Sequence, residues 1–317
     1  MLGKKQGQMS FGEMEAAHRV PEGHFLRQID RQIDWRPFLE ALEGLYHPRH
    51  GRPGYPPLVL FKALLLQRWY NLSDPGLEEA IRDRLSFQRF LGLSFQEPVP
   101  DETTFCRFRG ALAQTGLAER LLEVLETQLT ARGLLVKRGT LVDATLIQAH
   151  SQPPTPEKPS KDQDAAWAAR PRKRPFFGYK AHLALDQKSN LLRRLKLTAA
   201  KCHETQTFSG MVLGDEAAVF ADKAYDQDCR RAELRRRGVF CGILAQARKR
   251  RPLTDKQRRR NRLYSRIRVA VERVIGTLKW HYGLARFPYV GQARNYCHLL
   301  LVGICFNLKK MLVLQST

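Results

Sequence analysis

Three acidic residues stand in contexts that could bring them together around metal ions. Asp143 follows one short, apolar, β-rich run and Asp222 follows another at 217–221, which is typical of buried strands with an acid at the tip. Glu272 lies in a segment, 264–279, that is predicted to form a helix. Carboxylates are hard oxygen ligands suited to Mg²⁺ or Mn²⁺. Two such ions ~4 Å apart can clamp the attacking and leaving oxygens of a phosphoryl transfer. The acids therefore predict a metal-dependent enzyme that acts on nucleic acid.

The predicted helix also carries two basic residues close to its glutamate. At about 100° per residue, Arg268 lies about 40° from Glu272 and Lys279 about 20° from it, so all three share one face. A simpler interpretation is a surface ion pair between Arg268 and Glu272, which would contribute only a few tenths of a kcal/mol. A lone aspartate at a strand end is likewise most often a cap or turn residue. The order of the surrounding elements favours the catalytic interpretation.

From residue 134 onward the predicted elements follow the order β-β-β-α-β-α-β-α. They are strands at 134–145, 178–186, 191–197, 217–221 and 239–244, and helices at 205–213, 228–237 and 264–279, before a final apolar helix. A hairpin turn at 187–190 joins the second and third strands. This is the ribonuclease H-like order, in which neighbouring strand tips and a packed helix bring three distant acids together. The predicted fold class is mixed α+β, an N-terminal all-helical domain followed by a ribonuclease H-like catalytic domain.

The predicted domain boundaries follow the changes in pattern. They are an N-terminal arm at 1–35, a helical domain at 36–133 and the catalytic domain at 134–317, which contains a mobile loop rich in Pro, Lys and Ser at 151–175 and a basic connector at 246–262. Asp74-Pro75 and Asp101 are expected to cap helices of the helical domain. Its short helices fit a DNA-reading helix-turn-helix and an ordinary helical bundle equally well.

The charge of the chain is extreme and unevenly distributed. The formal net charge is +23 and the pI is about 10.2. Residues 1–140 carry 19 Lys and Arg against 17 Asp and Glu, whereas residues 141–317 carry 35 against 14. Lysine and arginine neutralise phosphates and release counterions, so nucleic acid is the predicted partner of the half that holds the three acids. A merely solvated basic surface, or association with ribosomes or membranes, would also fit the charge.

Cysteine usage and hydropathy indicate a reducing, non-membrane setting. The six cysteines form no Cys-x-x-Cys pair, as expected for reduced thiols in a cytosol. The N-terminal segment lacks the apolar core of a signal peptide. The apolar stretch at 299–314 is interrupted by Asn307, Lys309 and Lys310, so it is expected to be a buried helix and not a membrane span.

Several motifs together give the chain a family resemblance. They are Pro100–Arg109, Val142–Thr145, Phe177–His182, Ala221–Tyr225 and a tyrosine–arginine–glutamate–lysine signature. On these motifs the chain resembles bacterial insertion-sequence transposases of the Asp-Asp-Glu type, in the insertion-sequence-five-like family. Arg268, Glu272 and Lys279 stand at the signature spacing, whereas Tyr264 is one residue early and Ser265 occupies its place. The resemblance covers nearly the whole chain.

The resemblance implies a function and a set of site residues. Asp143, Asp222 and Glu272 would be the catalytic triad that binds two Mg²⁺ or Mn²⁺ ions. The partners would be the double-stranded DNA of element ends and target, bound by a homodimer or larger complex in a bacterial cytoplasm, at the nucleoid. Residues expected to contact DNA are Arg268, Lys279, Lys180, His182, Arg248, Lys249, Arg250, Arg251, Arg258, Arg259, Arg260 and Arg262. For Lys180 and His182 a solvated strand face is the alternative.

The expected reaction is metal-dependent cleavage at the element ends, followed by attack of the released 3′-hydroxyl on target DNA. One alternative is a ribonuclease H-like nuclease that cleaves without strand transfer. Another is a catalytically silent, transposase-derived regulator that only binds DNA.

Overall fold

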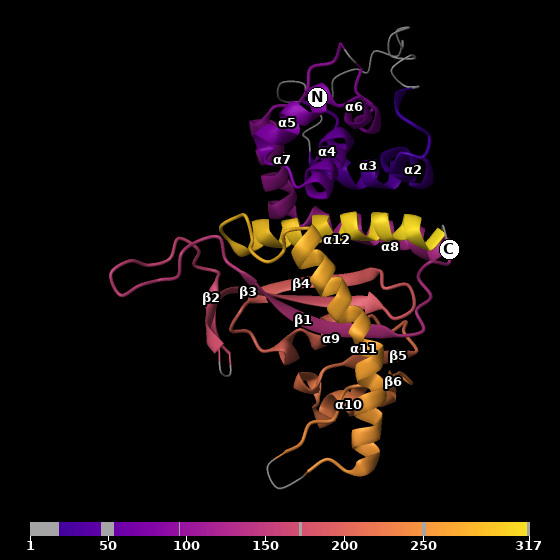
Figure 1. Ribbon diagram of the computed structural model, residues 1–317, viewed down its shortest axis with the longest axis vertical. Helices are drawn as coiled ribbons and strands as arrows, with labels where there is room; N and C mark the ends of the chain where they lie inside the picture. The colour runs from indigo at the N-terminus through magenta and orange to yellow at the C-terminus, as the bar shows by residue number, and fades with distance from the viewer. Residues whose placement is uncertain (1–18, 46–53, 95, 171–172, 249–251, 316–317) are drawn as a thin grey trace. The chain divides into compact units, whose positions relative to one another are not determined.

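The computed structural model describes residues 19–45, 54–94, 96–170, 173–248 and 252–315. The chain divides into two compact units, one made of residues 1–128 and 300–317 and the other of residues 129–299. Figure 1 shows the first as a group of helices and the second as a sheet with helices around it. The mixed α+β class predicted from the sequence is confirmed.

The helical unit is built from short, well-capped helices. They are α2 (Phe25–Gln32), α3 (Arg36–Leu42), α4 (Pro57–Tyr70), α5 (Asp74–Asp83), α6 (Leu85–Leu91), α7 (Glu102–Thr115) and α8 (Leu117–Ala131), which runs into the second unit, with a 3₁₀ turn η1 (Glu43–Leu45) after α3. Asp101 caps α7 as predicted, by accepting a hydrogen bond from the Thr104 amide at 2.7 Å. The cap of α5 is Ser73 and not Asp74, because the Asp74 carboxylate is bound elsewhere.

That carboxylate forms an ion pair inside the helical unit. Arg109, at the end of the Pro100–Arg109 motif, is 5% exposed and places Nη2 2.6 Å from Asp74 Oδ2 and Nη1 2.8 Å from Asp74 Oδ1. Gln67 on α4 donates a further hydrogen bond to the same carboxylate at 2.5 Å. The pair therefore ties α4, α5 and α7 together and makes Arg109 a structural residue.

The second unit contains a six-stranded mixed sheet. Its strands are β1 (Thr140–Gln148), β2 (Ala166–Arg170), β3 (Lys173–Asp186), β4 (Leu192–Ala199), β5 (Ala218–Ala221) and β6 (Phe240–Cys241). The order is β2-β3-β1-β5-β6, with β4 also paired to β3. Strands β1, β3 and β4 pair antiparallel, whereas β5 runs parallel to β1 and β6 parallel to β5. The parallel strands reach the sheet through helices, as such crossovers require.

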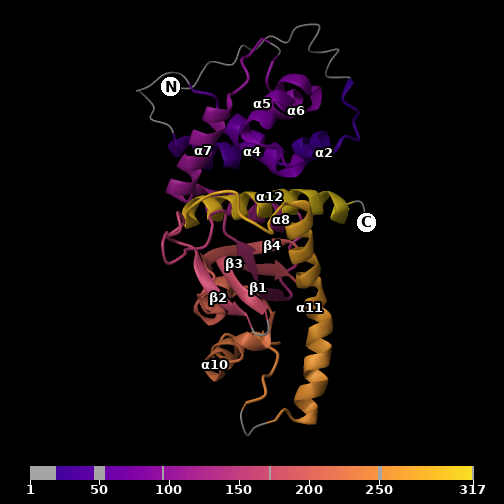
Figure 2. The ribbon, with the colours of Figure 1, turned by 60° about the vertical axis from the view of Figure 1, so that its left-hand side comes forward.

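Helices cover both faces of this sheet. Neighbouring residues of a strand point to opposite faces, and Val142, Ala221 and Leu234 belong to one buried cluster with α9 (Phe208–Met211) and α10 (Asp228–Arg236). The alternate residues face α11 (Asp255–His281), which packs along β1 and β5 (Figure 2). Asp143, next to Val142, is therefore directed at α11.

The prediction of a mobile loop at 151–175 is wrong for the second half of this segment, which forms β2 and the start of β3. Two hydrogen bonds, one of them buried, fix the segment before β2. Asp162 is 1% exposed and accepts a hydrogen bond from the Tyr179 hydroxyl at 2.6 Å. The Asp164 carboxylate accepts one from the Gln292 amide at 2.8 Å. The observed order of elements thus has one strand more than predicted.

Other boundaries also differ from the sequence-based prediction. The first strand begins at Thr140 and continues to Gln148, so Asp143 lies within it and not at its tip. The helix predicted at 205–213 is only the 3₁₀ turn η2 (Glu204–Gln206) followed by α9. Helix α11 begins at Asp255, inside the predicted basic connector, where Thr254 and Gln257 form a capping box.

One helix among the described residues, α12 (Gln292–Gln315), is long and apolar enough to cross a membrane by length and composition. However, 72% of its apolar window is buried inside the protein. Core helices of proteins without a membrane span pass the same test, and the burial of α12 is typical of them.

Candidate active site

Two of the three acids are brought to the same level of the sheet by strand pairing. Strands β1 and β5 are parallel neighbours with Val142 opposite Ala221, so Asp143 and Asp222 are the next residues on each. The Ala144 amide donates to Asp143 Oδ1 at 2.8 Å, and the Lys223 amide donates to Asp222 Oδ1 at 2.7 Å. Asp222 also caps the 3₁₀ turn η3 (Lys223–Tyr225) that follows β5.

A single guanidinium joins these two carboxylates. Arg268 Nη2 lies 2.8 Å from Asp143 Oδ2, and Arg268 Nη1 lies 3.4 Å from Asp222 Oδ1. The arginine side chain is 8% exposed, compared with 16% for Asp143 and 36% for Asp222. Its remaining donor, Nε, is buried and has no hydrogen-bond partner. The two aspartates and the arginine form the centre of the candidate site.

The position of Arg268 follows from the buried stripe of α11. The buried residues of this helix are Arg268, Val271, Val274 and Leu278, whose spacing of three or four residues defines one face. The prediction that Arg268 shares a charged face with Glu272 is therefore wrong. Arg268 lies among the apolar residues of α11, and its guanidinium points to the two aspartates. Glu272 is exposed and makes no ion pair with Arg268.

The charge balance of the site is unusual. Burial raises the pKa of Asp143 to about 6, against the lowering effects of the Arg268 charge and the Ala144 amide. The negative charges of Asp222 and Glu204 add to the increase. The charge of Arg268 thus does not offset the burial of Asp143 and the nearby negative charges of Asp222 and Glu204. Further positive charge beside these carboxylates would therefore be favourable.

Glu204 is a further acid near the site, and it lies in none of the motifs identified in the sequence. It begins η2, lies 3.7 Å from Lys180 Nζ through Oε1, and its charge raises the pKa of Asp143 and of Tyr225. Turn η2 also lies against η3, which follows Asp222. No spacing in the sequence indicates this proximity, because it depends on how the chain returns after β4.

Lys180 and His182 occupy interior positions on β3. The Lys180 ammonium donates to the Cys202 carbonyl at 2.9 Å. His182 is fully buried, with its two ring nitrogens each 3.0 Å from a hydroxyl, of Thr198 and of Thr207. Burial, followed by the charges of Lys180 and Lys196, lowers the pKa of His182 to about 4. The expected DNA contact by His182 is therefore wrong, and so is the alternative of a solvated strand face.

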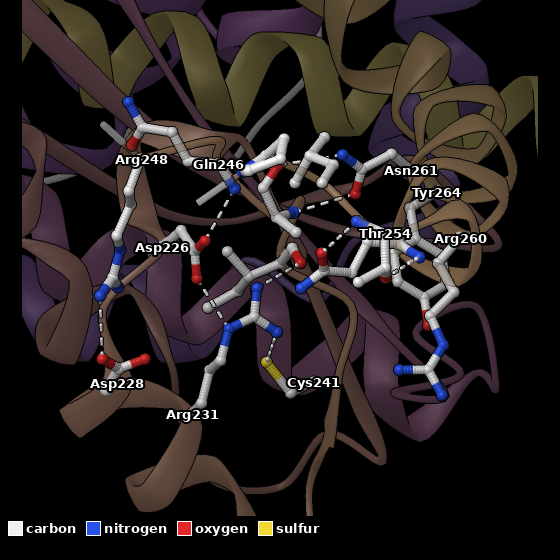
Figure 3. A pocket seen from close by; sticks show the side chains of 15 residues that line it. Asp226, Asp228, Arg231, Cys241, Gln246, Arg248, Thr254, Arg260, Asn261 and Tyr264 are labelled. Carbon is white, nitrogen blue, oxygen red and sulfur yellow. Dashed lines mark hydrogen bonds and ion pairs between the residues drawn. The ribbon is translucent and has the colours of Figure 1, made fainter. Parts of the chain in front are cut away.

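The N-terminal half of α11 is held by a polar network around a cavity of 360 Å³ (Figure 3). Asn261 Oδ1 accepts from the Ala245 amide and its Nδ2 donates to the Ala245 carbonyl, both at 2.9 Å. Arg231 pairs with Asp226 at 2.7 Å and donates to the Ile243 carbonyl at 3.0 Å. Of these groups Asn261 lies on α11, so its two hydrogen bonds to Ala245 are the clamp that holds α11 to the segment after β6.

The tyrosine of the signature belongs to the same supporting structure. Tyr264 packs edge-on against Phe220 and Phe240, with ring centroids 5.6 and 6.1 Å apart. Its ring therefore anchors α11 to β5 and β6.

Lys279, the lysine of the signature, is partly buried, and burial lowers its pKa.

Four of the basic residues expected to bind DNA lie on the surface of α11. Arg258, Arg259, Arg260 and Arg262 are all exposed, and Arg258 has a long contact of 3.9 Å to Asp255. Arg248 is also exposed and pairs with Asp228 at 3.2 Å. The expected contacts of Lys249, Arg250 and Arg251 lie outside the described residues.

The donor set at the centre fits a hard divalent cation. Two aspartates supply carboxylate oxygens to one shared cationic group, and the guanidinium of Arg268 stands where positive charge is required. Among the described residues no three or more His, Cys, Asp or Glu side chains are grouped closely enough to hold a metal ion. The structure brings together Asp143 and Asp222 but does not group Glu272 with them.

Comparison with known protein families identifies the family of the chain. A model described as transposase domain (DUF772) matches residues 14–111, and a model described as transposase DDE domain matches residues 135–308, more than half of the chain. The chain belongs to the DDE transposase family. It is therefore a DNA transposase, an enzyme of a family that typically uses divalent metal ions.

The transposase also has distant likenesses to solved structures. One is a piggyBac transposase synaptic complex with hairpin DNA, with 8% identity over 95% of this chain and 76% of that one and a TM-score of 0.43. Another is a pre-cleavage Mos1 transpososome, with 12% identity over 86% of this chain and 82% of that one and a TM-score of 0.18. Neither likeness is strong enough to carry an argument about the fold.

Proposed function

We propose that this transposase cuts DNA at the ends of its element and joins the released 3′-hydroxyl to target DNA, with Asp143, Asp222 and Glu272 as its acidic triad. The observation that carries the proposal is that the carboxylates of Asp143 and Asp222, from neighbouring parallel strands, meet at one cationic group. Glu272 is the next acid on α11, one turn beyond Arg268, and would complete the ligand set.

The proposal includes a ribonuclease H-like fold for residues 134–317, which the order of strands supports. Antiparallel strands β1, β3 and β4 are followed by parallel strands β5 and β6, and α11 packs over β1 and β5. Asp143 lies on β1 and Asp222 directly follows the neighbouring strand β5, and α11 brings Arg268 to the same place. This is the arrangement expected when three acids that are distant in sequence serve one site.

Some of these residues would hold the metal ions, and others would position the DNA backbone. Asp143 and Asp222 would hold Mg²⁺ or Mn²⁺, with two ions expected, and Glu272 would contribute to one of them. Bound divalent ions supply Lewis-acid stabilisation to the attacking and leaving oxygens of a phosphodiester. The protein would orient the DNA backbone with fixed cations, so its contribution is placement and electrostatic complementarity, without a covalent intermediate.

The outward face of α11 is the proposed path for that backbone. Arg259, Arg262, Arg266 and Arg273 are exposed, and successive multiples of about 100° place them within roughly 60° of one another. Together with Arg258, Arg260, Arg248 and Lys279, and with Lys249, Arg250 and Arg251 outside the described residues, they would neutralise phosphates. Phosphate contacts position DNA and carry no base code.

Assembly and location follow from the reaction. Because two element ends must be joined in one event, a homodimer or larger complex on double-stranded DNA is the proposed active form. The substrate would be chromosomal DNA in a bacterial cytoplasm. Sequence recognition is assigned to the helical unit, which leaves the α11 surface to bind DNA without base preference.

The proposal is tested by separating cleavage from binding. Asp143→Asn should abolish strand cleavage on element-end DNA in Mg²⁺ while gel-shift binding persists, because the basic surface is unchanged. Glu157→Gln is the matched control, since Glu157 is exposed and lies in the segment between β1 and β2. Cleavage by Asp143→Asn at a near wild-type rate would show that the metal assignment is wrong.

A further inference from the structure

We infer that Arg268 is the internal counter-ion of the metal-free transposase, and that divalent cations must displace its guanidinium from Asp143 and Asp222 when they bind. This inference rests on the proposed metal-binding role of the two aspartates. It makes the arginine a positioning residue with two alternative partners, the aspartates before metal loading and a DNA phosphate after it.

The first step is that the arginine occupies the Asp143 oxygen that a metal ion would need. Arg268 approaches Asp143 Oδ2 at 2.8 Å and Asp222 Oδ1 at 3.4 Å. The Ala144 amide already binds the other oxygen of Asp143, Oδ1, whereas at Asp222 the Lys223 amide and Arg268 share Oδ1. A dication placed between the carboxylates would also repel the guanidinium at contact distance. Metal binding and the Arg268 pairs are therefore mutually exclusive.

The second step is that the arginine is incompletely held. Its contact with Asp222 is long, and its Nε is buried without a partner. A buried donor that lacks a partner is unfavourable. By comparison, Arg109 reaches both oxygens of Asp74, at 2.8 and 2.6 Å. Arg268 thus has less to lose by leaving its acids than a purely structural arginine would.

The third step concerns the destination of the released group. The guanidinium remains tethered to α11 beside the two aspartates, so a phosphate held at that site comes within its reach. Arginine binds phosphate bidentately and strongly. By linkage, metal binding that frees Arg268 should strengthen DNA binding, and DNA should strengthen metal binding to the same degree. The pairing of Arg268 with the two aspartates would thus keep its guanidinium from binding phosphate until metal is present.

The test is calorimetric binding of calcium chloride to the full-length protein without DNA. Removing the competing cation in Arg268→Gln should tighten Ca²⁺ binding about tenfold, or about 1.4 kcal/mol, the scale of one charge-assisted hydrogen bond. Arg268→Lys keeps a charge but cannot bridge two carboxylates in the same way, so its Ca²⁺ affinity should lie between those of wild type and Arg268→Gln. That variant decides the question if Arg268→Gln does not fold.

Asp143→Asn distinguishes a failure of the metal assignment from a failure of the counter-ion inference, because it should lose Ca²⁺ binding if the metal assignment is right. If it binds Ca²⁺ as wild type does, the metal assignment fails and this inference falls with it. If it loses Ca²⁺ while Arg268→Gln, or Arg268→Lys in its place, binds no more tightly than wild type, the counter-ion inference alone is overturned. As a second readout, Ca²⁺ should strengthen element-end DNA binding by wild type more than by Arg268→Gln.

Discussion

Neutralising the outward face of α11 should change how DNA binding by this transposase depends on salt. The perturbation is the simultaneous change of Arg259, Arg262, Arg266 and Arg273 to Gln. All four are exposed and distant from the buried stripe of the helix, so the fold should be retained. Each phosphate contact that is lost should reduce the slope of log affinity against log salt by roughly 0.9.

Four contacts therefore predict a slope that is shallower by roughly 3.6. Between 50 and 200 mM salt the wild type should lose roughly 150-fold more affinity than the variant does, from the same slope difference. The assay is fluorescence anisotropy with an element-end duplex and with a random duplex of equal length. Both duplexes should be affected by similar factors, because phosphate contacts carry no base code.

The matched control removes the same charge elsewhere. Arg36, Arg82, Arg120 and Arg237 each pair with an acid of their own unit and are largely exposed. Their combined change to Gln should leave the slope close to wild type. An α11 variant with an unchanged slope, or a control with an equal reduction, would refute the assignment of the backbone path to this helix. Loss of element-end binding alone would instead show that α11 reads bases.

Three further predictions concern stability, measured by urea unfolding. Arg109→Met should destabilise the protein by about 3–5 kcal/mol, because it leaves the carboxylate of Asp74 partly buried without its partner, whereas Arg120→Gln at the surface should change little. Asn261→Ala should cost about 1–3 kcal/mol, because the amide and carbonyl of Ala245 both lose their partner; an unchanged stability would remove the clamp from the account. The lowered pKa of His182, about 4 in the folded protein, means that its neutral form is favoured by folding. Its contribution is complete above about pH 6.5, the unfolded value, and is lost as pH falls toward 4. The stability difference between wild type and His182→Gln should thus shrink by about 2 kcal/mol from pH 7.5 to 5, and a constant difference would contradict this.

The two aspartates could be placed from the sequence because strand patterning is local. Apolar runs before Asp143 and Asp222 predicted the two strands, although Asp143 lies within its strand and not at the predicted tip. The role of Arg268 could not be found in this way. An arginine four residues before a glutamate has the same spacing in a surface pair and in a buried stripe, and only the neighbours at Val271 and Leu278 show which face turns inward.

Composition misled the prediction at two segments. Residues 151–175 are rich in Pro, Lys and Ser, which favours a loop, yet β2 forms there because β3 offers it a pairing edge. Arginines at 258–262 suggested a connector, yet a capping box starts α11 at Asp255 and extends the helix through them. In both cases pairing or capping outweighed the average character of the segment.

The central claim is that Asp143 and Asp222 hold the divalent cations of the reaction. The most direct measurement is an anomalous-scattering map from crystals of the transposase grown with Mn²⁺ and element-end DNA. The account predicts a manganese peak bound by both carboxylates, with the guanidinium of Arg268 withdrawn from them and directed at a phosphate. Manganese bound elsewhere, with Arg268 still between the two aspartates, would contradict it.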